Sequence, residues 1–291
     1  MALLAATLCG AGPARAQAAG STLTLTVTDS SLRGPTTFTA GVVTMQVVNR
    51  GRGVHQVQLL QIANGRTVAE TKAYILANDR PPLQWTQLGL GIGPIESGQT
   101  NTVTFKLDPG TYLLVDLMPN AKGELNYHSG VWAPLSGAGT VGRELPNIPA
   151  VAGLIIANRF RFGNLFKSGN TWTQSESRDR STTVRPGLQT IRIESYVAPG
   201  HGVVLARGGP EVIRQYQDWT NGQRPTPPPG LVGGVVAVPG PNNNQPGRMA
   251  YNRVFLQVRL TVGGYILFCP VVDRQVGRHS DVGEFTQFSV Q

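Results

Sequence analysis

Short stretches of alternating apolar and polar residues recur along the first half of the chain. In the first of them, from Thr22 to Val27, leucine and valine alternate with threonine. A period of two residues is typical of a half-buried strand. Comparable stretches predict further strands, in chain order, over residues 42–48, 54–60, 102–107, 112–116 and 131–135. The pattern therefore predicts an all-β fold.

One helix interrupts these strands. Thr67 and Glu70 have the spacing of a capping box, and apolar residues follow until Asn78 and Pro81 end the pattern. The glycine-rich stretch 89–94 comes next. It has neither a lysine nor a following helix, so it is predicted to be a loop and not a phosphate-binding element.

The second half of the sequence repeats this order. His201 corresponds to His55, and Pro186-Gly187 to Ala40-Gly41, at a constant offset of 146 residues. Pro210 then suits the first position of a second helix, and apolar residues follow it at helical spacing. Beyond a longer loop the offset becomes 153. Three correspondences follow from it, namely Tyr112 with Tyr265, Asp116 with Cys269 and Asn126 with His279.

A fixed offset that changes once, at a loop, indicates duplication of a domain. The predicted organisation is a first domain over residues 21–136, a linker over 137–152 and a second domain over 153–291. Polar stretches at 163–183 and 223–248 interrupt the second domain and are predicted to be surface loops. The longer one is either disordered or an arm that docks on another subunit.

The charge of the chain is basic, with 25 lysines and arginines against 16 aspartates and glutamates and a net charge of +9. Such a surface favours an anionic membrane surface or an acidic partner, and the alternative is a soluble basic surface with no specific partner. The arginines are scattered and form no stripe, which argues against nucleic acid.

The first nineteen residues have the pattern of an export signal. Residues 2–8 form an apolar core, and Ala14-Arg15-Ala16 gives a cleavage site, so residues 1–19 are either removed or retained as an anchor. After removal Cys269 is the only cysteine, which leaves no intrachain disulfide. The predicted location is the periplasm, beside the inner membrane.

Each half resembles a cupredoxin domain. The resemblance covers nearly all of residues 21–291 and is carried by Pro109-Gly110-Thr111-Tyr112 and by the segment from Gly264 to Val290. It implies two tandem cupredoxin-like Greek-key β-sandwiches, each with one short helix.

The resemblance also implies where copper ligands would lie. A type 1 site uses two imidazoles, a thiolate and a weak axial methionine. In the first domain only His55 matches. Asp116, Asn126 and Val131 stand at the cysteine, histidine and methionine positions, so the resemblance implies a domain without metal.

In the second domain His201, Cys269 and His279 match, and Glu284 stands at the methionine position. One interpretation is a copper site, and zinc is an alternative ion for the two histidines and the cysteine. The sequence favours the interpretation without a cofactor. In that case Cys269 is a small buried apolar residue and the two histidines belong to loops or to the core.

The sequence contains no catalytic motif such as Gly-x-Ser-x-Gly or His-Glu-x-x-His, so no catalytic residue and no enzymatic activity are predicted. The predicted function is a non-enzymatic accessory or scaffold subunit on the periplasmic face of a membrane complex. By analogy between folds, that complex would carry out respiratory or photosynthetic electron transfer. The alternatives are a copper-dependent electron carrier or copper-binding protein that uses the second domain, and a cell-surface binding module with residues 223–248 as its contact.

Overall fold

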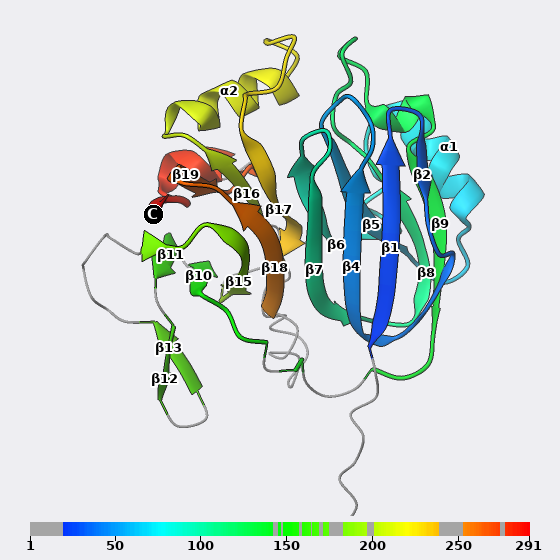
Figure 1. Cartoon of the computed structure of the whole chain (residues 1–291). Coiled ribbons are helices and arrows are strands. Elements are labelled where there is room, and N and C mark those ends of the chain that lie inside the picture. Colours follow the sequence, from blue (N-terminus) through cyan, green and yellow to red (C-terminus); the bar gives the residue numbers. More distant parts are fainter. Residues whose placement is uncertain are drawn as a thin grey trace, which may run out of the picture.

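The fold is all-β, as predicted, with one short α-helix in each half (Figure 1). The computed structural model describes residues 20–141, 145–146, 148–156, 159–163, 165–168, 171–174, 183–196, 201–238, 253–273 and 277–291. The predicted export signal lies outside the described residues. Within them, no helix is both long and apolar enough to cross a membrane.

The first half places its strands in two layers. One sheet receives β1 (Ser21–Thr28), β2 (Ser31–Arg33), β4 (Gly41–Asn49) and β7 (Thr100–Leu107). The other receives β3 (Thr37–Thr39), β5 (His55–Ile62), β6 (Thr86–Ile95), β8 (Gly110–Val115) and β9 (Trp132–Ala138). Burial alternates along the whole of β4, as its period of two predicts. The alternate side chains fill the space between the layers.

The second half repeats the arrangement. Its part of the first sheet is β10 (Ala152–Ile156), β11 (Phe160–Gly163), β15 (Gly187–Ser195) and β18 (Arg253–Leu260). Its part of the second is β14 (Thr183–Val184), β16 (His201–Arg207), β17 (Leu231–Val238), β19 (Gly263–Phe268) and β22 (Phe285–Val290). Two small hairpins are added, β12 (Leu165–Ser168) with β13 (Thr171–Gln174), and β20 (Val272–Asp273) with β21 (Gly277–Arg278).

Both sheets continue from one half into the other. Strands β7 and β18, which correspond to each other in the repeat, pair antiparallel with Val103 opposite Leu256. In the other sheet β6 pairs with β17, and Ile92 lies opposite Val235. We call this boundary between the halves the seam. Because corresponding strands pair with each other there, a pseudo-twofold axis at the seam relates the two halves. One apolar core runs through both halves, so the halves share a core as well as two sheets.

The predicted loop at 89–94 is wrong, because these residues belong to β6. Its glycines are needed where three strands crowd together. A Cβ atom on Gly91 would lie 2.0 Å from the carbonyl oxygen of Val57 on β5. A Cβ atom on Gly93 would lie 2.9 Å from the backbone of Gly234 on β17. Here glycine permits close approach of backbones.

The two predicted insertions also contain strands. Over 231–238 the loop prediction is wrong, because β17 lies there and carries the seam between the halves. Residues 239–248 lie outside the described residues. The stretch 163–183 contains the β12–β13 hairpin. The ends of the predicted linker over 137–152 belong to β9 and β10, and its other described residues, 139–141, 145–146 and 148–151, form no helix or strand.

The helices cover the outer face of the second sheet, one on each half (Figure 1). Helix α1 (Val68–Asn78) begins with the predicted capping box between Thr67 and Glu70. Helix α2 (Glu211–Thr220) begins one residue later than predicted, because Pro210 is its N-cap residue and not its first helical residue. Two 3₁₀ turns, η1 (Asn126–Ser129) and η3 (His279–Val282), occupy corresponding places in the halves.

Candidate metal centre

The structure brings together the four residues that the sequence placed at ligand positions in the second half. His201 opens β16, Cys269 follows β19, His279 opens η3 and Glu284 precedes β22. Because β19 runs antiparallel to both β16 and β22, these strand ends meet at one edge of the sheet. We call these residues the four-residue cluster.

The ligand atoms of the cluster face one another. The Nδ1 atoms of His201 and His279 are 3.2 Å apart, and Cys269 Sγ is 3.6 Å from His279 Nδ1. One carboxylate oxygen of Glu284 lies 2.8 Å from the first of these nitrogens and 3.2 Å from the second. One potential ligand atom from each residue lies within 4.8 Å of the others.

Two of these separations match those expected around a single ion, whereas the 2.8 Å between Glu284 and His201 is a hydrogen-bond distance. Two nitrogens bound at zinc-like distances and tetrahedral angles lie about 3.3 Å apart, and a sulfur and a nitrogen about 3.5 Å apart. The observed distances of 3.2 and 3.6 Å agree with both values. Two imidazoles with a thiol form the donor set that suits copper, and zinc accepts the same atoms.

The cluster is buried, which makes its ionisable groups costly without a partner. Cys269 is fully buried, and the other three residues are between 6 and 8% exposed. Burial raises the pKa of the Cys269 thiol to about 12. Burial also opposes ionisation of Glu284, but the hydrogen bond from His201 and the charges of both histidines outweigh it and lower the pKa of that carboxyl group. A bound cation would favour the thiolate in the same way.

Backbone hydrogen bonds hold the ligand segments in place. The N–H of Cys269 donates to the carbonyl of Glu284 (2.9 Å), and the N–H of Glu284 donates to the carbonyl of His279 (3.1 Å). The N–H of Gly202 donates to Cys269 Sγ at 3.4 Å. These hydrogen bonds link the segments that carry Cys269, His279 and Glu284.

The corresponding positions of the first half also meet, and we call His55, Asp116 and Asn126 the first-half cluster. Asp116 Oδ2 lies 2.6 Å from His55 Nδ1 and accepts a hydrogen bond from Asn126 Nδ2 at 3.0 Å. All three residues are buried. Val131, at the fourth position, is buried in the apolar core. No thiol and no second imidazole is present, so this cluster lacks the donors of a copper site.

The first-half cluster includes one residue that the sequence did not single out. Asp29, in the turn after β1, lies 3.1 Å from His55 Nε2. Burial lowers the pKa of His55, but the hydrogen bonds and charges of Asp116 and Asp29 outweigh it and raise the pKa above its usual value. Gly51 makes room for this contact, because a Cβ atom there would lie 2.5 Å from the imidazole. Nothing in the sequence pairs Asp29 with a histidine 26 residues away.

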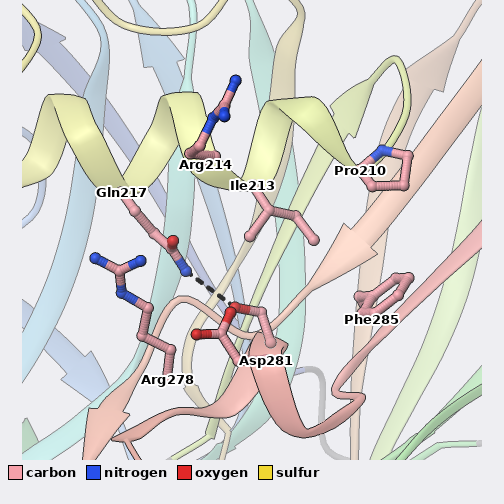
Figure 2. Close-up of a pocket in the computed structure, with 8 residues that line it drawn as sticks. Pro210, Ile213, Arg214, Gln217, Arg278, Asp281 and Phe285 are labelled. Atoms are coloured by element: carbon pink, nitrogen blue, oxygen red, sulfur yellow. Dashed lines mark hydrogen bonds between the residues drawn. The ribbon is translucent and has the colours of Figure 1, made fainter.

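The sequence also did not predict a contact between α2 and the segment that carries His279 of the four-residue cluster. Gln217 Nε2 donates to Ser280 Oγ at 2.9 Å, and both residues are buried. This hydrogen bond fixes η3, which carries His279, to the helix (Figure 2). The remaining histidine, His128, lies outside both clusters and contacts Asp79 at 2.5 Å.

No protein-family model and no curated protein matches the chain. Among solved structures, it is similar to auracyanin from the photosynthetic bacterium Roseiflexus castenholzii, with 20% identity, coverage of 42% of this chain and 99% of that one, and a TM-score of 0.30. Rusticyanin from Thiobacillus ferrooxidans gives 14% identity, coverage of 48% and 75%, and a TM-score of 0.28. A multicopper oxidase gives 13% identity, coverage of 93% and 88%, and a TM-score of 0.24.

These neighbours have the cupredoxin-like type of fold that the sequence resembles. At such identities and TM-scores, the similarity says nothing about metal binding or function in this chain.

Proposed function

We propose that the chain is a copper protein that binds one ion through His201, Cys269, His279 and Glu284 and transfers single electrons. One observation carries this proposal: four buried residues with ligand-capable side chains direct one atom each into a space where all lie within 4.8 Å. These atoms contact one another within the cluster. Their types and their closeness allow a single cation to bind all four.

The donor set favours copper and an electron-transfer role. Thiolate and imidazole ligands suit copper, and affinities for divalent first-row ions are highest for copper. A carboxylate at the fourth position is a harder ligand than methionine, and we expect it to favour the oxidised ion and to lower the reduction potential. Four protein ligands also leave no open position for a substrate, in contrast to catalytic sites with three. The proposed role is therefore non-enzymatic.

The periplasmic location and the partner on a membrane complex stay predictions. An electron carrier needs a donor and an acceptor, so a partner of electron-transfer type is compatible with this role. The basic net charge of +9 is compatible with an acidic partner or an anionic membrane surface.

Metal analysis and an optical spectrum before and after addition of Cu(II) test the proposal. We expect one equivalent of copper and an intense visible band from the thiolate–copper bond. The band should disappear in Cys269→Ser and persist in His128→Ala, which alters a histidine outside both clusters. A colourless protein without stoichiometric copper would contradict the proposal.

A further inference from the structure

A pocket of about 360 Å³ lies beside the four-residue cluster, between α2 and η3 (Figure 2). The residues that line it are Pro210, Ile213, Arg214, Gln217, Arg278, Ser280, Asp281 and Phe285. None of the four candidate ligands is among them. However, His279 lies between two lining residues in the sequence, and Glu284 immediately precedes a third. A molecule in this pocket would thus lie next to the ligand segments without reaching the ligand atoms.

The charged side chains of this pocket are mainly basic. Arg214 and Arg278 both line the pocket. In Figure 2, Arg278 lies below α2 with Asp281 and Phe285, whereas the side chain of Arg214 extends upward from the helix. Neither arginine forms an ion pair with any residue that the structure describes. Asp281 is the only acidic side chain in the lining. The pocket therefore has unpaired positive charge.

A third arginine and two apolar residues extend this surface past the pocket. A Cβ atom on Gly283 would lie 3.5 Å from the Cγ atom of Arg159, so this exposed arginine packs against the end of η3. Val282 and Phe285 are 49% and 37% exposed. Arginine and aromatic residues beside exposed apolar side chains are typical of protein–protein interfaces.

The corresponding pocket of the first half has a different charge. A pocket beside η1 is lined by Asp79, Glu124, Leu125 and His128, with Gly123 and Ser129, and it contains no lysine or arginine. At the offset of 153 residues, Leu125 corresponds to Arg278 and His128 to Asp281. The basic residue at position 278 accordingly occurs in the half that contains the four-residue cluster and not in the other half.

We propose that this pocket is the docking site for carboxylate side chains of an acidic redox partner protein. The proposal rests on the proposed copper function, because a docked partner would exchange electrons with an ion held by the adjacent residues. Guanidinium groups bind carboxylates with two parallel hydrogen bonds, and charge complementarity accelerates encounter between proteins. The exposed apolar side chains then supply the short-range contact.

Titration of the full ¹⁵N-labelled chain, without added copper, with a hexaglutamate peptide tests the proposal by NMR. In about 20 mM salt the Debye length is about 20 Å, so surface charges act strongly. We expect saturable shifts at the amides of Arg214, Gln217, Arg278, Ser280 and Phe285. The double variant Arg214→Glu/Arg278→Glu should bind at least about tenfold more weakly, because like charges then oppose each other.

The matched control is Arg33→Glu/Arg259→Glu, which makes the same change in net charge at two exposed arginines that do not line the pocket. Equal weakening in both double variants would overturn the proposal, because the attraction would then come from the net charge alone. Inorganic phosphate that binds the same amides as tightly as the peptide would also overturn it, in favour of a site for small anions. The absence of saturable shifts on addition of the peptide would also overturn the proposal.

This experiment uses no metal, so its result is independent of the copper test. A protein that binds the peptide but no copper would contradict the proposed function and leave the acidic docking surface in place. A protein that binds copper but not the peptide would contradict only the docking proposal.

Discussion

The two halves hold different side chains on the same backbone frame, and the comparison shows how one frame supports two kinds of buried polar site. In the first half every member of the cluster finds a protein partner, and Asp116 is the acceptor for both of its neighbours. In the second half two imidazole nitrogens, a thiol and a carboxylate meet at one point. A buried polar network is stable when all its members are paired. Both clusters meet this condition through protein contacts, but only the second also has the donors for an ion.

The largest expected effect concerns the first-half cluster. Asp116→Ala should lower the free energy of unfolding by about 3–5 kcal/mol, because two buried donors, His55 Nδ1 and Asn126 Nδ2, lose their acceptor at about 1–3 kcal/mol each. Urea denaturation measures this loss. The matched variant Cys269→Ala in the metal-free protein removes an uncharged buried thiol and should cost roughly 1 kcal/mol. Equal losses in the two variants would mean that Asp116 is no more important than an apolar core residue.

The sequence predicted the frame well because the repeat is visible in it. Strand periodicity and two fixed offsets place His201, Cys269 and His279 opposite their first-half counterparts, and the structure brings both sets together. The capping box of α1 is also confirmed. These features depend on residues that are close in the sequence or related by the duplication. Local patterns are sufficient to find them.

The seam between the halves was not predictable in the same way. Strands β6 and β17 are rich in glycine, which normally weakens a strand and marks a loop. Gly91, Gly93 and Gly234 are required because the backbone of a neighbouring strand passes within about 3 Å of where a Cβ atom would stand. The neighbour is β17 across the seam for Gly93, and β5 and β16 within one half for Gly91 and Gly234, so the requirement comes from strand pairing and from no local pattern. The contact between Asp29 and His55 escaped prediction for the same reason.

The next largest effect tests whether the four-residue cluster binds an ion. Zn(II), which does not oxidise the thiol, should raise the free energy of unfolding by about 2.7 kcal/mol at a concentration one hundred times its Kd. The reason is that the four donors come together in the folded chain. Thermal unfolding with and without zinc measures this change.

Cys269→Ser should lose most of the gain from zinc, and Asp116→Asn should keep it, because the first-half cluster lacks the donors for an ion. Equal loss of the zinc effect in the two variants would show that the clusters are not independent.

The smallest effect concerns the proton that His55 shares with Asp116. The pKa of His55 is raised in the folded protein, so the folded state holds a proton that the unfolded state releases above about pH 6.5. The stability from this proton is complete below the unfolded pKa and is lost as the pH rises through the folded one. The slope is at most about 1.4 kcal/mol per pH unit for one proton.

Urea denaturation of the metal-free protein between about pH 5.5 and 7.5 should therefore show falling stability, in a range below ordinary thiol and tyrosine titration. Asp116→Asn should flatten the profile, because a neutral amide does not retain the proton. The second half is identical in the two proteins, so the difference between the two profiles isolates the first-half pair. Parallel profiles would mean that no proton is held between His55 and Asp116. The first-half cluster would then be a set of neutral hydrogen bonds. An internal charge pair would not be the reason that this cluster is stable without a metal ion.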